Sequence, residues 1–212
     1  MMKMSQEEQL ARDGLVKLAK SLFDRGYTHG SSGNMSVMLS DNTIIATPTN
    51  SCFGDLDVNT LSKIDVYGNH LSGDKPTKEV PMHLAFYTTN AHYRAVVHLH
   101  STYLTALSCL KDVNKGNCLP GVSPYFFMKV GKLPLLPYFK PGSQEIANTI
   151  LQYAKTNSAI LLANHGPVIA GKTLKEAVYN IEELENTAKL YFLLKPYKYN
   201  ELSQAEINQL IT

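Results

Sequence analysis

Two histidines separated by one residue are the strongest chemical signal in this sequence. His98 and His100 lie in the motif Val-His-Leu-His-Ser, at the end of a short valine-rich run. Side chains of a β-strand alternate between its two faces, so the two imidazoles would project from the same face. Two imidazoles in this arrangement can bind one divalent metal ion. The motif alone also fits two unrelated histidines, one buried and one hydrogen-bonded.

A third histidine, His165, follows an apolar run in the turn-like motif Asn-His-Gly-Pro. Loops held by a rigid sheet commonly carry functional side chains. Three histidines with an open fourth position are typical of a catalytic zinc site, whereas structural zinc sites usually have four ligands and are rich in cysteine. A turn residue that tolerates unusual backbone angles is the alternative interpretation of His165.

Two segments offer hydrogen-bond donors that suit a phosphate group. Residues 30–36 read Gly-Ser-Ser-Gly-Asn-Met-Ser, and residues 47–51 read Thr-Pro-Thr-Asn-Ser. Glycine lets backbone N–H groups approach a ligand, and hydroxyl and amide side chains add further donors. The first segment is neither a Walker loop nor a dinucleotide fingerprint, and the start of a plain hairpin explains it equally well.

Glu79 and Tyr125 are further candidates. Glu79 lies near a predicted helix start, where a carboxylate interacts favourably with the helix dipole. It would act as a metal ligand or proton carrier only if the fold brought it near the histidines. Tyr125, between two other ring-bearing residues, is interpreted from the pattern as a partly buried aromatic residue. The remaining histidines are interpreted as structural or surface residues: His29, His70, His83 and His92.

The elements that must position these residues alternate between helices and strands. Apolar periodicity and capping signals predict helices over residues 5–25, 75–89 (after an initial turn), 102–110, 143–155 and 173–194, and a short helix within 203–212. Strands are predicted over residues 35–39, 43–47, 95–100, 160–163 and 168–170. The segment 119–141 holds five prolines and is predicted to form strands joined by loops. This order predicts an α/β fold, a single-domain α/β/α sandwich with a mostly antiparallel or mixed central sheet.

Composition bounds the class of protein. The chain of 212 residues is 44% hydrophobic and 18% charged, which predicts one globular domain over residues 1–212. A net charge of +2 argues against a nucleic-acid partner, and no apolar run approaches the ~20 residues that cross a membrane. Three cysteines without Cys-x-x-Cys spacing, and Glu7 and Glu8 where a signal peptide would be apolar, predict a cytoplasmic protein.

Taken together, the motifs resemble those of a known family. Gly-Ser-Ser-Gly-Asn-Met-Ser, Thr-Pro-Thr-Asn, Thr-Lys-Glu, Val-Val-His-Leu-His-Ser, Ser-Pro-Tyr and Asn-His-Gly occur in the order and spacing of the class II (zinc) aldolases of the L-fuculose-phosphate aldolase type. The resemblance extends from about Leu10 to Ile211. Within the family, residues 51–63, 71–80, 97–110 and 161–168 are most similar to the 3-oxo-tetronate 4-phosphate decarboxylases.

The resemblance implies a role for each motif residue. His98, His100 and His165 match the ligands of Zn2+, one ion per subunit, and Glu79 matches an acid/base carboxylate that can also bind the metal. Tyr125 matches a tyrosine that donates a proton from a neighbouring subunit, since family members are typically homotetramers. The residues that match the substrate site, in which the phosphate is held, are Gly33, Asn34, Thr49, Asn50 and Thr77.

Two positions depart from the family pattern. The family usually has glycine where this chain has Asn50; asparagine also tolerates positive φ, but its side chain could crowd the phosphate. The aldolases have a hydroxyl residue where this chain and its decarboxylase relatives have Lys78. A lysine beside the metal would pair with a substrate carboxylate, which a sugar-phosphate substrate lacks. A solvated surface lysine is the alternative.

The implied reaction is zinc-dependent decarboxylation of 3-oxo-tetronate 4-phosphate, a small-molecule substrate, to dihydroxyacetone phosphate and CO2 in four-carbon acid sugar catabolism. Loss of CO2 leaves electrons at C2, delocalised into the C3 ketone. Aldol cleavage of a ketose 1-phosphate reaches the same species by expelling an aldehyde, so the metal site alone does not separate the two reactions. Epimerisation of a pentulose phosphate and non-catalytic binding of a phosphorylated metabolite are further alternatives.

Overall fold

The computed structural model describes residues 4–210, so the ends of the predicted domain, 1–3 and 211–212, lie outside the described residues. The strands are β1 (Asn34–Met38), β2 (Ile44–Ala46), β3 (Ser62–Ile64), β4 (His70–Ser72), β5 (Ala95–His98), β6 (Leu135–Leu136), β7 (Ala159–Leu162) and β8 (Gly166–Gly171). The helices are α1 (Gln6–Asp24), α2 (Val80–Thr89), α3 (Thr102–Ser108), α4 (Pro124–Lys129), α5 (Gln144–Tyr153), α6 (Leu174–Leu194) and α7 (Gln204–Asn208).

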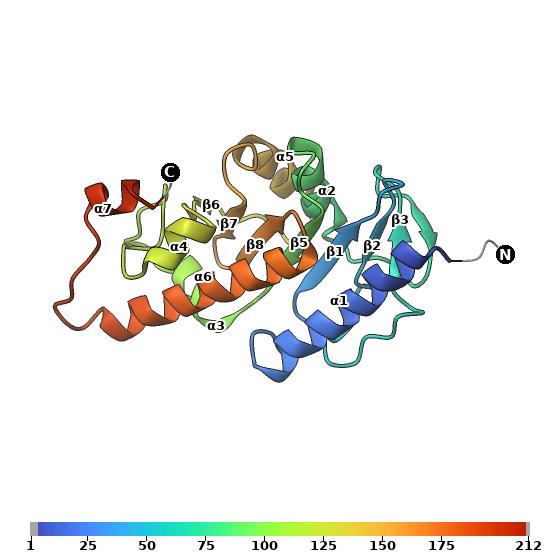
Figure 1. The fold of residues 1–212 in the computed structure, drawn as a ribbon, viewed down its shortest axis with the longest axis horizontal. Coiled ribbons are helices and arrows are strands. Elements are labelled where there is room, and N and C mark those ends of the chain that lie inside the picture. Colours follow the sequence, from blue (N-terminus) through green and yellow to red (C-terminus); the bar gives the residue numbers. More distant parts are fainter. Residues whose placement is uncertain (1–3, 211–212) are drawn as a thin grey trace.

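The strands form one sheet in the order β4-β3-β2-β1-β5-β8-β7-β6. Six of its neighbouring pairs are antiparallel, and β6 pairs with β7 in parallel. Figure 1 shows the long helices α1 and α6 on one side of the sheet and α2 and α5 on the other. The predicted α/β sandwich with a mostly antiparallel or mixed sheet is confirmed.

The central strands β5, β7 and β8 bury both of their faces, which explains why they are almost wholly apolar. On β5, Ala95 and Val97 pack into the core beneath α1, α3 and α6, whereas Val96 packs into the core beneath α2 and α5. On β8, Ile169 faces the first core and Val168 the second. The period of two therefore divides each strand between two hydrophobic layers.

Helices α1, α6 and α7 begin at capping residues, as the sequence predicts. The hydroxyl of Ser5 accepts a hydrogen bond from the Glu8 N–H, and that of Thr173 accepts one from the Glu176 N–H, each at 3.1 Å. A complete capping box forms at Ser203, where the short tail helix α7 begins. Within residues 4–210, no helix is long and apolar enough to cross a membrane.

The proline-rich segment 119–141 corrects one prediction. It contains helix α4 and the two-residue strand β6, not a series of strands joined by loops. Pro124 stands in the first turn of α4, where its fixed φ suits a helix and its missing N–H leaves no helical bond unmade. Ser123 caps this turn by accepting a hydrogen bond from the Tyr125 N–H at 3.3 Å. Strands β3 and β4 were not predicted.

Candidate metal-dependent active site

Three histidines from two neighbouring strand ends converge on one point. The Nε2 atom of His98 lies 3.1 Å from Nε2 of His100 and 3.2 Å from Nε2 of His165. Strand β5 ends at His98, so the predicted strand to residue 100 is two residues too long. The two imidazoles are nevertheless adjacent, and β8 pairs with β5 so that the turn holding His165 lies beside them.

Glu79 completes the cluster from the start of α2, which covers this face of the sheet. Its side chain lies at the start of α2, with Oε2 3.4 Å from His98 Nε2 and Oε1 3.4 Å from His165 Nε2. One ligand atom from each of Glu79, His98, His100 and His165 lies within 4.8 Å of the others. Ligand atoms around a tetrahedral zinc ion, at zinc–nitrogen distances of ~2.0–2.1 Å, lie about 3.3 Å apart. The cluster therefore has the atoms and the spacing to bind a divalent metal ion.

The protonation states of the cluster suit a cation. The Nδ1–H of His98 donates to the Pro167 carbonyl oxygen at 2.8 Å, so Nε2 carries the lone pair. Burial lowers the pKa of His98 to about 3 and also lowers the pKa of His100 and of His165. Burial opposes ionisation of Glu79, yet the facing imidazoles and an amide donor hold its pKa below the ordinary value. The donor set is thus three neutral imidazoles and one carboxylate.

Two of these residues have a buried polar atom without a hydrogen-bond partner among the described residues. They are Oε1 of Glu79 and Nδ1 of His165. An unpartnered buried polar group destabilises a fold by about 1–3 kcal/mol, so such atoms usually have a purpose. Glu79 Oε1 lies against the histidines, where a metal ion or the proton of a reaction would meet it.

A cavity of about 420 Å³ opens beside this cluster. Its walls include Glu79, His100 and parts of both segments predicted to hold phosphate, residues 30–34 and 48–50. The structure also brings all of the predicted substrate-binding residues to this cavity: Gly33, Asn34, Thr49, Asn50, Thr77 and Lys78. The separate sequence motifs therefore share one space.

Backbone geometry explains how the cavity walls approach the cluster. Gly33 has φ +84°, and a Cβ atom there would lie 2.9 Å from the His98 carbonyl oxygen, so only glycine fits. Asn50 has φ +58°, a left-handed conformation that asparagine tolerates, so the turn expected at this position forms. The Thr49 N–H donates to Lys75 O at 2.9 Å and the Thr77 N–H donates to Thr47 O at 3.2 Å, which fixes the two threonines side by side.

The side chain of Asn34 is directed at Glu79. Its Nδ2 donates to Glu79 Oε2 at 2.8 Å, and its Oδ1 lies 2.6 Å from Nε2 of His83. His83, interpreted from the sequence as structural or surface, is buried one side chain behind the carboxylate. Its place four residues after Glu79, on the same helix face, was the available signal.

Glu185 is a second residue that the sequence analysis missed. From α6, its carboxylate accepts hydrogen bonds from the Ser101 hydroxyl and from the backbone N–H groups of Tyr103 and Leu104, at 2.7–2.9 Å. A carboxylate at a helix N-terminus satisfies free N–H groups and the helix dipole. The chain immediately after His100 is thereby anchored to α6.

Tyr125 lies apart from this site within the described chain. It stands on α4 with 57% of its surface exposed, and it does not line the cavity beside the histidines.

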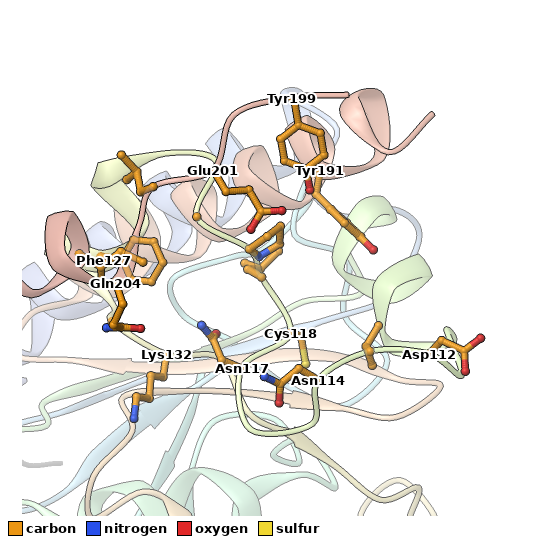
Figure 2. Close-up of a pocket in the computed structure, with 17 residues that line it drawn as sticks. Asp112, Asn114, Asn117, Cys118, Phe127, Lys132, Tyr191, Tyr199, Glu201 and Gln204 are labelled. Carbon is orange, nitrogen blue, oxygen red and sulfur yellow. The ribbon is translucent and has the colours of Figure 1, made fainter. Parts of the chain in front are cut away.

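A second cavity, of about 590 Å³, lies between residues 112–132 and the C-terminal segment (Figure 2). Figure 2 shows Tyr199 and Glu201 on one side of this cavity and Asn114 and Asn117 on the other. No member of the histidine cluster lines it.

The fold and the cluster define a class of protein, and comparison with known families agrees. Residues 13–192 match the family described as Class II Aldolase and Adducin N-terminal domain. The chain belongs to this family. The resemblance seen in the sequence motifs is confirmed.

Individual relatives show which named proteins within this family the chain is similar to. A protein of Escherichia coli O6:H1 named 3-oxo-tetronate 4-phosphate decarboxylase is 50% identical over 205 residues, which are 96% of each chain. A Methanococcus maripaludis protein named L-fuculose phosphate aldolase is 37% identical over 183 residues, 86% of this chain and 97% of that protein. The crystal structure of YgbL from Escherichia coli has a TM-score of 0.95 and 48% identity, over 97% of this chain and 99% of that chain.

Proposed function

We propose that this protein is a metal-dependent carbon–carbon lyase that converts 3-oxo-tetronate 4-phosphate into dihydroxyacetone phosphate and CO2. The observation that carries the proposal is the cluster of three imidazoles and a carboxylate on the wall of a cavity that also holds Lys78. The identity of 50% to a protein named for this reaction, against 37% to one named as an aldolase, supports decarboxylation over aldol cleavage.

Zinc is the proposed metal, one ion per subunit, held by His98, His100 and His165 with Glu79 as a further ligand before substrate binds. Three neutral imidazoles with an open position are the usual donor set of a catalytic zinc ion. When bound, such an ion supplies Lewis-acid stabilisation of the negative charge that develops on the substrate oxygen.

The phosphate binds, in this proposal, where the Gly33–Asn34 turn meets Thr49, Asn50 and Thr77. These residues line the same cavity, and they offer backbone N–H groups, hydroxyls and an amide. The positive φ values of Gly33 and Asn50 turn the backbone at this wall, an arrangement that suits close contact with an anion.

Lys78 pairs with the carboxylate that is lost as CO2. Its side chain is exposed, it lines the cavity, and its charge contributes to the lowered pKa of His100 and of His165, so it lies within electrostatic range of the cluster. An ammonium group there would select a substrate that carries a carboxylate at this end over a ketose phosphate, whose only charged group is the phosphate bound elsewhere in the cavity.

Carbon C2 must take up a proton after CO2 leaves. Glu79 and Tyr125 are the candidate proton carriers. Since the pKa of Glu79 is held low, its carboxylate is ionised, which suits metal binding and leaves it no proton to donate. Tyr125 is the proposed donor, supplied by a neighbouring copy in a homotetramer; its exposure on α4, away from its own cavity, supports this assignment.

A cytoplasmic location completes the proposal. The three cysteines of the described chain are free thiols, as expected in a reducing compartment.

The decisive experiment mixes zinc-loaded protein with freshly made 3-oxo-tetronate 4-phosphate and follows CO2 and dihydroxyacetone phosphate together. Equal release of both, lost on chelation and restored by zinc, is the expected result. Release of neither would contradict the proposal. A panel of ketose 1-phosphates then tests the second candidate, aldol cleavage, which the aldolase-named relative supports.

A further inference from the structure

A buried row of polar side chains extends behind Glu79 into the interface between β1 and α2. Hydrogen-bond distances of 2.6–2.8 Å connect Tyr87 Oη to Ser36 Oγ, Ser36 Oγ to His83 Nδ1, His83 Nε2 to Asn34 Oδ1, and Asn34 Nδ2 to Glu79 Oε2. Every residue of this row is buried. We call it the Tyr87–Glu79 row.

Two secondary-structure periods create the row. Asn34 and Ser36 are two residues apart on β1, so both face α2. Glu79, His83 and Tyr87 are spaced by four residues along α2 and share the face toward β1. The polar groups of strand and helix therefore meet in alternation, in a layer that is otherwise hydrophobic.

The carboxylate of Glu79 fixes the direction of the two hydrogen bonds nearest to it. A carboxylate only accepts, so Asn34 must present its NH2 group to Glu79 and its carbonyl oxygen to His83. His83 must then carry its proton on Nε2, which donates to Asn34 Oδ1.

The remaining directions follow from burial of the imidazole. Burial lowers the pKa of His83 to about 4, so the ring is neutral and Nδ1 accepts. Ser36 donates its hydroxyl proton to Nδ1, and the Ser36 oxygen accepts from Tyr87. All donors of the row thus point toward Glu79.

The row gives the two carboxylate oxygens of Glu79 different surroundings. Oε2 is bound by the Asn34 amide, whereas Oε1 has no hydrogen-bond partner within residues 4–210 and faces the histidines. Glu79 makes no capping bond to its own helix either, although it occupies the N-cap position. Asn34 is the side chain that holds the carboxylate, and His83 is the side chain that holds Asn34.

We propose that His83 is a positioning residue: through Asn34 it fixes the Glu79 carboxylate, with Oε1 presented to the metal and substrate. The proposal rests on the proposed function only in that Glu79 belongs to the metal cluster. Without the His83 donor, the Asn34 amide is free to rotate and to present its oxygen to the carboxylate, a repulsive arrangement that turns Glu79 away.

The test compares His83→Phe with His83→Gln. Phenylalanine fills the site but removes both polar contacts, whereas glutamine retains a donor for Asn34. We expect His83→Phe to weaken zinc affinity, measured by competition with a chelator, by about 10- to 100-fold. We expect His83→Gln to stay within about threefold of the wild type, because the bond to Asn34 survives.

The affinity measurement needs no substrate, so it separates this proposal from the proposed function. If the wild type releases no CO2 but His83→Phe alone loses zinc affinity, the reaction is wrong and the positioning role stands. Wild-type affinity in His83→Phe, or equal loss in both variants with native circular dichroism, would overturn the positioning role. His92→Gln, at an exposed histidine outside the site, is the matched control.

Ser36→Ala keeps the test decisive if His83→Phe fails to fold. It removes the donor to His83 Nδ1 and leaves the Asn34 contact in place. Nitrogen-15 NMR of the metal-free wild type should show His83 as a single neutral tautomer protonated at Nε2. Ser36→Ala should show a mixture of tautomers with zinc affinity lowered by about two- to fivefold. A wild-type ring protonated at Nδ1 would contradict the row as described.

Discussion

The two sides of Glu79 differ sharply. Behind it, the Tyr87–Glu79 row is buried and every donor has an acceptor; in front of it, the cavity is walled by loops and by the exposed Lys78. The rear side fixes one carboxylate orientation, whereas the front side offers groups that a different substrate would use differently. The proposed metal site thus rests on a buried layer, whereas the proposed substrate contacts lie in loops, which vary more readily than the elements that they connect. Substitutions behind Glu79 should therefore affect metal binding, whereas substitutions in front of it should affect the reaction with a particular substrate.

Substitution of a proposed metal ligand should give the largest effect. His165→Ala removes one imidazole of the cluster, and we expect loss of stoichiometric zinc and at least about 1000-fold lower turnover, with circular dichroism near native. Metal analysis and a CO2 assay measure both. Wild-type activity without bound metal would refute the metal mechanism.

Tyr125→Phe should come next. It removes one proton and little surface, so we expect kcat to fall by about 100-fold while KM changes little. Steady-state kinetics with matched circular dichroism measure this.

Mixing Tyr125→Phe with His165→Ala tests the origin of the tyrosine. If Tyr125 serves a neighbouring subunit, co-refolded mixtures regain activity, because some sites then combine native histidines from one chain with a native tyrosine from another. Mixtures as inactive as either parent would place Tyr125 in the site of its own chain and contradict its supply by a neighbouring subunit.

Lys78→Ala probes the front side of the cavity. We expect kcat/KM on the acid phosphate to fall by about tenfold, or ~1.4 kcal/mol, with zinc content unchanged. Lys75→Ala, at an exposed lysine that does not line this cavity, is the control. Unchanged kcat/KM in Lys78→Ala would refute the carboxylate pairing.

The metal-free protein should show an effect on stability rather than on catalysis. His83 and His98 have pKa values lowered to about 4 and about 3 in the folded chain, against an ordinary 6.5. As pH falls below 6.5 the unfolded chain takes up protons that the folded chain does not, so stability falls with pH. The Tm of the metal-free protein should therefore fall between pH 7 and 4, by about 2–4 °C per kcal/mol lost. His83→Gln should reduce this fall; a Tm that rises on acidification would contradict the assignment.

The core strands and the starts of the long helices were predicted from the sequence better than the loops around them. The apolar runs of β5, β7 and β8 and the Ser5 and Thr173 caps depend on local periods and local hydrogen bonds, which a sequence displays directly. The prediction of strands for segment 119–141 was wrong because proline begins a helix in one context and breaks it in another.

The convergence of the site was less visible in the sequence. His98 and His100 are close by spacing alone, but the approach of Glu79 depends on how α2 crosses the sheet. The motifs identified these residues through a family resemblance. His83 and Glu185 belong to no motif, and they became visible only when the structure placed each against its partner.

The anchoring of α3 by Glu185 has a consequence for how the protein is made. The loop after His100 is tied to a carboxylate more than 80 residues further along the chain. A ribosome that has released the first histidines has therefore not yet supplied the group that holds them in register. The first two imidazoles therefore stay without this anchor until α6 has been synthesised.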